Sequence, residues 1–457
     1  MRGGAESEGP VNLRRDPSGE TAVLSRADNT LFRFATAGSV DDGKSTLVGR
    51  LLHDSKAILV DQLDALTRAS AARGFGGGDR LDFALLTDGL RAEREQGITI
   101  DVAYRYFATD RRSFILADCP GHVQYTRNMV TGATTADAVV VLVDVRKGVL
   151  EQTRRHLSVV RLLRVPHLVV TVNKVDLVGY EEAVFRGVES EVIAVATELG
   201  IDDPRVIPVS ALEGDNVVEP SANTPWYEGP ALLELLETLS VVDEVESATA
   251  PFRFPVQSVI RPQGALAPGL DADDYRDYRG YAGQVASGSV RVGDRVTVIP
   301  GGATTTVTAI DRAGEARETA FATQSLALRL ADDLDVARGH VIVAEGTHPL
   351  PSSDLTASLF WLDPRPLTPG ARILVKYGTA TVQALVRELQ GRFDLDTLGL
   401  HPAERLEIND IGRATLRLAS ALPLQPYAEH RRAGAFVVIH PQDGATLAAG
   451  TVIDTAA

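Results

Sequence analysis

The sequence predicts an α/β domain with a mostly parallel, doubly wound sheet, followed by two small all-β barrel domains. Over residues 29–243, strand-like segments alternate with helix-like segments, which is the order of a sheet with helices on its faces. From about residue 250 the chain shows short strands, many glycine turns and little helix, as small barrels do. A glycine-rich loop between the first strand and the first helix predicts a phosphate site.

The domain boundaries follow from these changes in pattern and from the length, because 457 residues are too many for a single core. The first segment is polar, is interrupted by glycine and proline, and carries no apolar signal region, so we expect it to be disordered. A second change of pattern near residue 348 separates the two barrels. The expected parts are an N-terminal extension over residues 1–28, the α/β domain over 29–243, and barrels over 250–347 and 350–457.

The elements of the α/β domain are predicted from residue periodicity. Residues 100–108 alternate with period two, as in a strand with one exposed face. Residues 31–37 form the first strand, and four later segments are short, β-branched and continuous, as in strands buried on both faces. The four later strands are expected at residues 113–118, 138–145, 167–174 and 205–210, and helices at 44–56, 151–164 and 181–200.

Composition narrows the class of protein. The net charge of −15 disfavours nucleic acid or an anionic membrane as the main partner, because both are bound through Lys and Arg. The sequence contains no run of 18 or more apolar residues, so it predicts no membrane-spanning helix. The single cysteine, Cys119, excludes an internal disulfide and is consistent with a reducing compartment. We therefore expect a cytoplasmic protein that binds neither nucleic acid nor membrane.

The stretch GSVDDGKS, residues 38–45, fits the pattern G-x-x-x-x-G-K-[ST] in the setting that this motif requires, between a strand and a helix. Its glycines allow backbone N–H groups to surround phosphates, and the helix N-terminus adds a favourable dipole. Lys44 is expected to reach the β and γ phosphates, and the Ser45 hydroxyl to bind Mg²⁺. The alternative is a plain glycine turn. The predicted phosphate-binding residues are Gly38, Ser39, Val40, Asp41, Asp42, Gly43, Lys44, Ser45 and Thr46.

The stretch NKVD, residues 173–176, indicates that the base is guanine rather than adenine. At the end of the fifth strand, the Asp176 carboxylate can accept N–H bonds from guanine N1 and N2, a donor pair that adenine lacks. Residues 210–212, SAL, follow the sixth strand, and their backbone is expected to contact guanine O6. Alone, these patterns are more often a helix cap and a strand-end turn. The predicted base-binding residues are Asn173, Lys174, Val175, Asp176, Ser210, Ala211 and Leu212.

The stretch DCPGH, residues 118–122, follows the third strand and is predicted to approach the γ-phosphate. Asp118 is expected to hold Mg²⁺ through water, and the Gly121 N–H to contact the γ-phosphate. His122 is placed to orient the attacking water, although a lone histidine is more often a surface or helix-start residue. Cys119 is most simply a small buried filler, and Pro120 completes the motif.

Thr99 lies in EREQGITI, residues 93–100, between the phosphate loop and the third strand. Its hydroxyl can bind Mg²⁺ when the loop closes over the nucleotide, and a loop ordered by the γ-phosphate and released on hydrolysis is a switch. The alternative is a turn that enters a strand. The five motifs occur in the order of a GTPase, so the sequence predicts a site for GTP and Mg²⁺, with Lys44, Thr99, Gly121 and His122 as its catalytic residues.

Two family resemblances refine this prediction. The stretches AEREQGITI, DCPGH and PWYEGP resemble elongation factor Tu, but Ser39, Asp42 and Cys119 depart from the usual pattern of translation factors. The stretches GSVDDGKSTLVGRLL, LLTDGLRAEREQGITIDVAYRYF and DCPGHVQYTRNMVTGAT are similar to the large GTPase subunit of bacterial sulfate adenylyltransferase, over about residues 29–450. Residues 261–283 are longer than expected for that family, and His440 replaces its usual acidic residue.

The second resemblance implies a GTPase subunit that pairs with a small adenylyltransferase subunit. The small subunit of that family makes adenosine 5′-phosphosulfate and pyrophosphate from ATP and sulfate, an uphill reaction to which GTP hydrolysis is coupled. The rival interpretations are a translational GTPase that acts on the ribosome and tRNA, and a regulatory GTPase without a metabolic reaction. Because the sequence holds no second phosphate-loop motif, we expect no adenylylsulfate kinase activity in this polypeptide.

Overall fold

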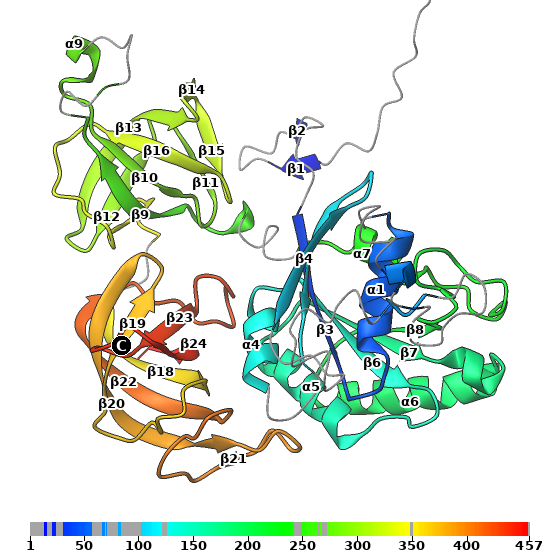
Figure 1. Cartoon of the computed structure of the whole chain (residues 1–457). Coiled ribbons are helices and arrows are strands. Elements are labelled where there is room, and N and C mark those ends of the chain that lie inside the picture. Colours follow the sequence, from blue (N-terminus) through cyan, green and yellow to red (C-terminus); the bar gives the residue numbers. More distant parts are fainter. Residues whose placement is uncertain are drawn as a thin grey trace, which may run out of the picture. The chain divides into compact units, whose positions relative to one another are not determined.

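The computed structural model describes residues 13–15, 21–23, 31–56, 66–68, 70, 81–83, 102–120, 126–241, 248–262, 266, 272–347 and 351–455. The chain divides into two compact units, of which the second contains Ser240–Ala457. The first is built mainly on the α/β sheet, and each unit is described by itself below. Figure 1 labels their elements.

A six-stranded sheet forms the centre of the α/β part, in the order β4-β5-β3-β6-β7-β8. Neighbouring strands from β5 to β8 run parallel, and β4 alone is antiparallel to its neighbour. The predicted doubly wound, mostly parallel sheet is therefore confirmed. The strands are β3 Leu31–Gly38, β4 Ala103–Ala108, β5 Ser113–Asp118, β6 Ala138–Asp144, β7 His167–Asn173 and β8 Arg205–Val209.

Burial explains why these segments form strands. Every residue of β6, AVVVLVD, is buried, as expected for a parallel strand covered on both faces. In contrast, β4 lies at the edge of the sheet, and exposure alternates along it, with Tyr104 and Tyr106 on the exposed face. The predicted strands agree with the observed ones to within a residue, apart from 100–108, whose first residues lie outside the described part of the chain.

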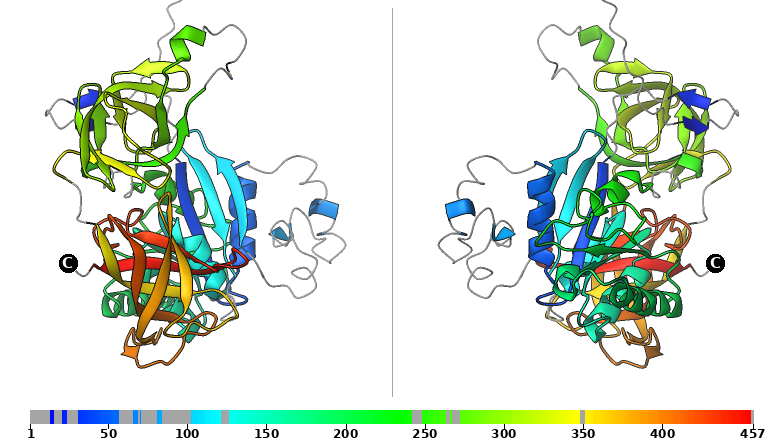
Figure 2. Two further views of the ribbon diagram at one scale, coloured as in Figure 1. Left: turned by 90° about the vertical axis from the view of Figure 1, so that its left-hand side faces the viewer. Right: turned by 90° about the vertical axis from the view of Figure 1, so that its right-hand side faces the viewer.

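Helices connect these strands along the chain. In α6, the buried residues Phe185, Val188, Val192 and Ala196 recur at helical spacing and form one apolar stripe. The helix ends before Gly200, whose φ of 69° is the left-handed conformation that commonly terminates helices. Figure 2 shows the sheet and α1 from two further sides. The helices are α1 Lys44–Asp54, α4 Thr126–Thr134, α5 Glu151–Leu162, α6 Glu182–Glu198 and α7 Leu232–Thr238, with a short 3-10 helix, η3, at Val175–Val178.

The first barrel closes through six strands in the order β12-β17-β9-β10-β16-β13, because β12 also pairs with β13. A short helix, α9 Ala272–Tyr275, lies between β9 and β10, within the segment 261–283 that the sequence marks as long. The six strands are β9 Arg253–Ile260, β10 Gly280–Gln284, β12 Arg295–Ile299, β13 Ala303–Arg312, β16 Ser325–Leu330 and β17 Val341–Ala344, and the smaller strands are β11 Ser289–Arg291, β14 Glu315–Arg317 and β15 Thr319–Phe321.

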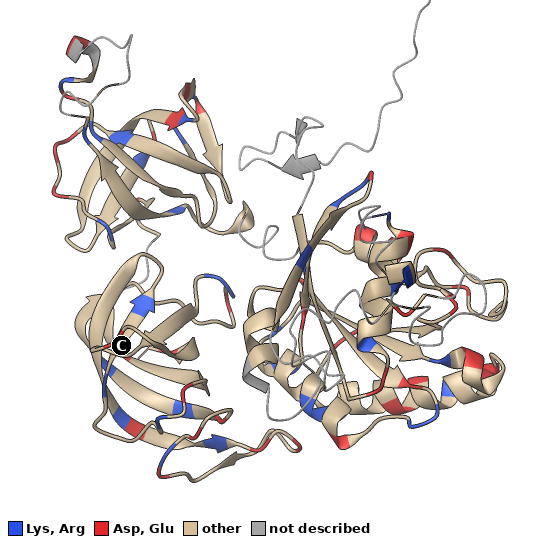
Figure 3. Cartoon of the chain, in the orientation of Figure 1, with Lys and Arg blue, Asp and Glu red and all other residues tan. Residues whose placement is uncertain are grey.

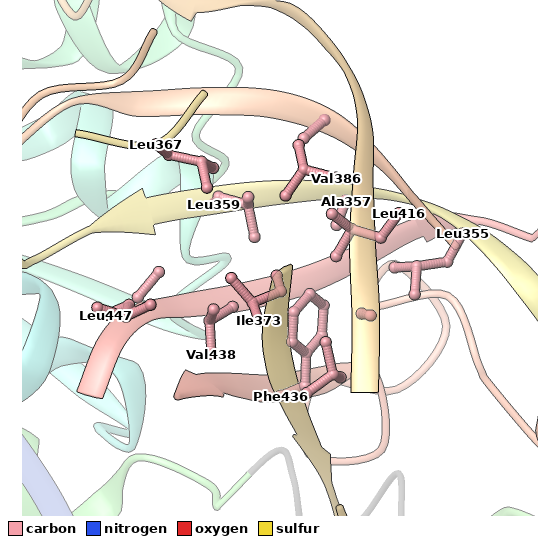
Figure 4. Packing of buried hydrophobic residues seen from close by; sticks show 14 of the residues in the cluster. Leu355, Ala357, Leu359, Leu367, Ile373, Val386, Leu416, Phe436, Val438 and Leu447 are labelled. Atoms are coloured by element: carbon pink, nitrogen blue, oxygen red, sulfur yellow. The ribbon is translucent and has the colours of Figure 1, made fainter. Parts of the chain in front are cut away.

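The second barrel has the same plan, with six strands in the order β19-β23-β24-β18-β22-β20 and closure of β19 on β20. Its core is apolar, and Figure 4 shows Leu359, Val386 and Phe436 among the side chains that fill it. Burying one such side chain contributes about 1.5–3 kcal/mol. The strands are β18 Ser352–Trp361, β19 Arg372–Tyr377, β20 Ala380–Phe393, β22 Ile411–Leu422, β23 Ala435–Ile439 and β24 Thr446–Asp454, with β21 Leu400–His401 paired to β20.

The fold class predicted from the sequence is thus confirmed in all three parts, whereas the exact domain boundaries remain predictions. In the N-terminal extension, β1 Leu13–Arg15 and β2 Thr21–Val23 pair with each other, and the rest of residues 1–28 lies outside the described part. None of the described helices combines the length and the apolarity needed to cross a bilayer. Figure 3 shows basic and acidic residues interspersed over the described elements.

Candidate nucleotide-binding site

The carboxyl ends of five neighbouring strands bring the predicted motifs to one edge of the sheet. Thr36 of β3 is in register with Asp118 of β5, and Asp144 of β6 is in register with Asn173 of β7. The chain that follows β3 runs to β4 and β5 on one side, whereas the chain that follows its other neighbour, β6, runs to β7 on the opposite side. In open α/β sheets, ligands bind in the crevice at such a switch point.

The phosphate loop joins β3 to α1. Asp41 and Gly43 have φ angles of 69° and 91°, which curl the backbone into a left-handed turn before the helix. Gly43 is the N-cap of α1, and no side chain caps this helix start. Because the first N–H groups of a helix have no partners within the helix, this uncapped end of α1 suits an anion.

Lys44 is held inside the site by a carboxylate. Its Nζ lies 2.5 Å from Oδ1 of Asp118, to which the Thr36 hydroxyl also donates at 2.9 Å. Lys44 is 7% exposed and Asp118 is 1% exposed, so the pair is shielded from water. The structure therefore brings together the phosphate-loop lysine and the first residue of the DCPGH motif.

Asp42 is a buried carboxylate within the phosphate loop. Its Oδ2 accepts a bond from the Ser39 N–H at 2.9 Å, while its Oδ1 is buried without a hydrogen bond and lies 3.7 Å from Nζ of Lys147. Burial raises the pKa of Asp42, and the Ser39 N–H and the Lys147 charge act in the opposite direction. The loop therefore adds negative charge where phosphate is expected, and this charge requires cations nearby.

Asn173 connects the base-binding side of the site to the phosphate loop. Its Nδ2 donates to the Asp42 carbonyl at 2.7 Å, and its Oδ1 accepts from the Ala211 N–H at 2.9 Å. A Cβ at Gly43 would lie only 2.4 Å from Nδ2 of Asn173, so this position requires glycine. One buried amide thus joins three segments that the sequence predicts as separate parts of one site.

Lys174, Asp144 and Arg146 form a charged cluster that sequence reasoning only partly identified. Lys174 donates to the Asp41 carbonyl and lies 3.0 Å from Oδ2 of Asp144, to which Arg146 is also paired at 2.6 Å. Burial raises the pKa of Asp144, but bonds from Arg146 and Lys174 outweigh it and hold that pKa below its usual value. Asp144 could have been found from sequence, because it ends a buried strand of the sheet just as Asp118 does.

The predicted base-binding residues occupy the expected strand ends. Asp176 is partly exposed at the start of η3, whereas Val175 is fully buried and can contribute only through its backbone. Ser210 and Ala211 are buried directly after β8, and Leu212 is 39% exposed. An accessible carboxylate beside buried backbone suits recognition of a polar base edge.

Side-chain oxygens of the phosphate loop and of β5 are suited to binding phosphate and metal. The Ser39 hydroxyl oxygen is buried without a hydrogen-bond partner, so the phosphate loop holds an unused polar group. Ser45 is partly exposed in the first turn of α1, and Asp118 supplies a carboxylate oxygen at the end of β5. Hydroxyl and carboxylate oxygens are the ligands that Mg²⁺ prefers, so these residues fit the predicted metal.

Three of the predicted catalytic residues, Thr99, Gly121 and His122, lie outside the described part of the chain. Their roles remain predictions. Within the DCPGH motif, Cys119 and Pro120 are described and buried, and the Cys119 N–H donates to the Thr36 carbonyl at 3.2 Å. Backbone pairing with β3 therefore continues past Asp118 and fixes the start of the motif.

Cys119 is expected to resist alkylation in the folded chain. The side chain is fully buried, and a Cβ on Gly132 would lie 2.4 Å from its Sγ, so no space remains beside the sulfur. Burial, helped by the Asp118 charge, raises the pKa of Cys119 to about 12. Because the thiolate is the reactive form, alkylation by iodoacetamide at neutral to mildly alkaline pH should be about a thousandfold slower than in the urea-unfolded chain. Mass spectrometry of this single cysteine measures both rates, and equal rates would contradict the buried placement.

Comparisons with known proteins match two parts of the chain to family models. The elongation factor Tu GTP binding domain matches residues 29–247, and the GTP-eEF1A C-terminal domain-like family matches residues 354–453. These matches support binding of GTP by the α/β part. They also agree with the observed order of an α/β domain and a C-terminal barrel.

Curated relatives match nearly the whole chain. A protein of Mycobacterium tuberculosis named bifunctional enzyme CysN/CysC is 49% identical over 93% of this chain and 67% of its own length. Proteins named sulfate adenylyltransferase subunit 1 are 44% identical in Pseudoalteromonas atlantica, over 93% of this chain and 87% of the relative, and 48% identical in Methylorubrum extorquens, over 95% and 90%.

Proposed function

Because this chain belongs to the family of sulfate adenylyltransferase subunit 1, we propose that it hydrolyses GTP and couples the hydrolysis to sulfate activation by a partner subunit. The coupled reaction forms adenosine 5′-phosphosulfate and pyrophosphate from ATP and sulfate. The similarity to elongation factor Tu is a relationship of fold, since the relatives that match nearly the whole chain carry the sulfate adenylyltransferase name.

The observation that best supports GTP as the nucleotide is the bridge made by Asn173. It places the NKVD motif against the phosphate loop at one end and against the Ser210–Leu212 turn at the other. A nucleotide with its phosphates at the N-terminus of α1 then has its base near Asp176. The carboxylate of Asp176 can accept two bonds from the N1 and N2 donors of guanine.

In the proposed mechanism, the residues of the phosphate loop bind before any bond breaks. Lys44 exchanges its buried partner, Asp118, for phosphate oxygens, while the backbone of residues 41–43 donates to the remaining oxygens. Lys147 and Lys174 offset the carboxylates of Asp42 and Asp144 around the phosphates. Without these cations the site would repel a polyanion.

Ser45, Asp118 and Thr99 are the proposed holders of Mg²⁺, which when bound offsets the charge of the β and γ phosphates. Gly121 would contact the γ-phosphate through its N–H, and His122 would orient the attacking water. The loops that carry Thr99 and His122 would change conformation when the γ-phosphate leaves, and that change would be transmitted to the partner.

The proposed partner is a small adenylyltransferase subunit that binds ATP and sulfate. Forming a sulfate–phosphate anhydride from ATP is uphill, so coupling to GTP hydrolysis provides the missing driving force. We propose a cytoplasmic complex that needs neither nucleic acid nor a membrane. The acidic net charge of −15 is consistent with a protein that binds neither nucleic acid nor an anionic membrane.

The function is tested by measuring pyrophosphate release from ATP and sulfate with this chain co-expressed with the small subunit. Release should require sulfate and should rise strongly when GTP is added, because only the hydrolysable nucleotide drives the uphill step. The matched control replaces GTP by its non-hydrolysable β,γ-imido analogue, which should not sustain release.

Hydrolysis of GTP that is independent of sulfate and gives no gain in pyrophosphate would keep the GTPase assignment but remove the sulfate reaction. A ribosome pelleting assay would then test the translational role. Co-sedimentation of this chain with ribosomes only in the GTP form would support that role instead.

A further inference from the structure

A cleft of about 1100 Å³ lies in the unit that contains Ser240–Ala457, and it includes none of the residues assigned to GTP. Its lining comes from β9, β10 and β16 of the first barrel, from the segment that carries α9, and from Tyr377 and Pro423 of the second barrel. Clefts of a few hundred to a thousand cubic ångströms are the usual size for small organic ligands. The charges on this lining indicate what kind of ligand it suits.

Arg253 places an uncompensated positive charge at the cleft. The residue is 7% exposed, and its Nη2 donates to the Pro423 carbonyl at 2.9 Å, but its Nη1 is buried without a hydrogen bond. Among the residues that the structure describes, its polar neighbours are this carbonyl and the Tyr377 hydroxyl, and no carboxylate forms an ion pair with it. Burial lowers the pKa of this guanidinium, as expected for a cation removed from water, and the neighbouring Tyr377 hydroxyl acts in the opposite direction.

The remaining lining does not neutralise this charge. Arg329 and Arg432 also line the cleft, whereas Asp311 is the only carboxylate among its described lining residues. Asp311 is already engaged, because Nε of Arg329 lies 3.3 Å from its Oδ2 and the Tyr278 hydroxyl donates to it at 2.9 Å. In a chain of net charge −15, a buried arginine without a carboxylate partner among the described residues is a local reversal of sign.

We propose that this cleft binds a small organic molecule through a phosphate or sulfate group, with Arg253 supplying the main counter-charge. A guanidinium suits a tetrahedral oxyanion because its fixed N–H groups can donate in pairs. The cleft is larger than a single inorganic ion requires, and the rings of Tyr275 and Tyr278 provide apolar surface for the rest of the ligand. The proposal does not depend on the proposed GTP chemistry.

The segment 261–283, which is longer than expected for the family, would form part of the ligand site. It carries α9 and both tyrosines, and it therefore adds aromatic surface to a cleft whose charge comes from the barrel strands. The ligand would contact both barrels, because Arg253 belongs to the first and its carbonyl partner, Pro423, follows the last residue of β22 in the second.

The test measures binding to the full-length chain by isothermal titration calorimetry, with the guanine nucleotide site saturated by GDP and Mg²⁺. The probes are adenosine 5′-monophosphate, adenosine, inorganic phosphate and inorganic sulfate. Adenosine monophosphate should bind at least about tenfold more tightly than adenosine, because only the former carries the oxyanion. Equal affinity for these two probes, or no binding of any oxyanion up to about 10 mM, would overturn the proposal.

The inorganic probes identify the source of the oxyanion. Tighter binding of adenosine monophosphate than of phosphate or sulfate would show that the organic part contributes, as proposed. Inorganic ions that bind as tightly as the nucleotide would overturn the organic ligand and leave a simple ion site.

Two variants test whether the charge of the lining is responsible. Arg253→Gln should weaken binding of adenosine monophosphate at least about tenfold, since it removes the counter-charge. Gln257→Glu should do the same without touching a buried group, because Gln257 is exposed on β9 and lines the cleft. The matched control is Gln383→Glu on exposed β20 surface outside the cleft, which should bind as the wild type does. Wild-type affinity in both lining variants would contradict the proposal.

Discussion

Replacing Lys44 by alanine should lower GTP hydrolysis at least about a thousandfold, because Lys44 is the only positively charged side chain in the phosphate loop, residues 38–45. The substitution should also lower the stability of the folded protein. Lys44 is the partner of the buried Asp118 carboxylate, and removal of one member of a buried pair destabilises a protein by about 3–5 kcal/mol. Steady-state phosphate release and thermal unfolding, measured together, separate the two effects.

The control for this experiment is Lys56→Ala, which removes the same side chain from an exposed position just beyond α1. It should hydrolyse GTP at the wild-type rate. A second variant, Lys44→Arg, keeps a counter-charge for Asp118 and should recover stability more than activity, because a guanidinium does not reproduce a compact ammonium. Normal turnover of GTP by Lys44→Ala would remove the phosphate-loop assignment.

Replacing Asp176 by asparagine should shift the preference of the chain from GTP toward xanthosine triphosphate. Guanine offers two donors to the carboxylate, whereas xanthine offers one donor and one acceptor, which match the oxygen and nitrogen of an asparagine amide. Affinity for GTP should fall about a hundredfold, since two charge-assisted bonds are lost. Competition binding with both nucleotides measures the shift.

The matched control here is Asp203→Asn, an exposed aspartate of the same domain with a positive φ of 50° that asparagine tolerates. It should leave the ratio of the two affinities unchanged. If Asp176→Asn retained the full preference for guanine, the base would be read by another residue, and the role proposed for the NKVD motif would be wrong.

The strands and the sheet topology were predictable because buried parallel strands have a recognisable local pattern. The run AVVVLVD can be assigned to a buried strand from its own residues alone, and the structure has β6 at this position. The motifs at the strand ends were predictable for the same reason, since the carboxyl edge of such a sheet collects them. Thr99, Gly121 and His122 remain predictions.

Interactions between distant segments could not be predicted in this way. The burial of Asp42, the raised pKa of its carboxyl group and its approach to Lys147 depend on how two strand ends meet, not on the letters around each residue. The same holds for Arg253, which looks like an ordinary strand arginine in the sequence. Its burial and its bond to the Pro423 carbonyl, 170 residues away, appear only in the folded chain.

The bridge made by Asn173 has a consequence for the kinetics of nucleotide binding. It links the phosphate loop to the Ser210–Leu212 turn through protein atoms alone, so contacts within the protein position the parts that receive the base and the first phosphates. A ligand that enters a preorganised pocket loses little conformational entropy from the protein, and its association need not wait for a slow rearrangement. Exchange of GDP for GTP at this part of the site should therefore be governed by the rate at which GDP leaves.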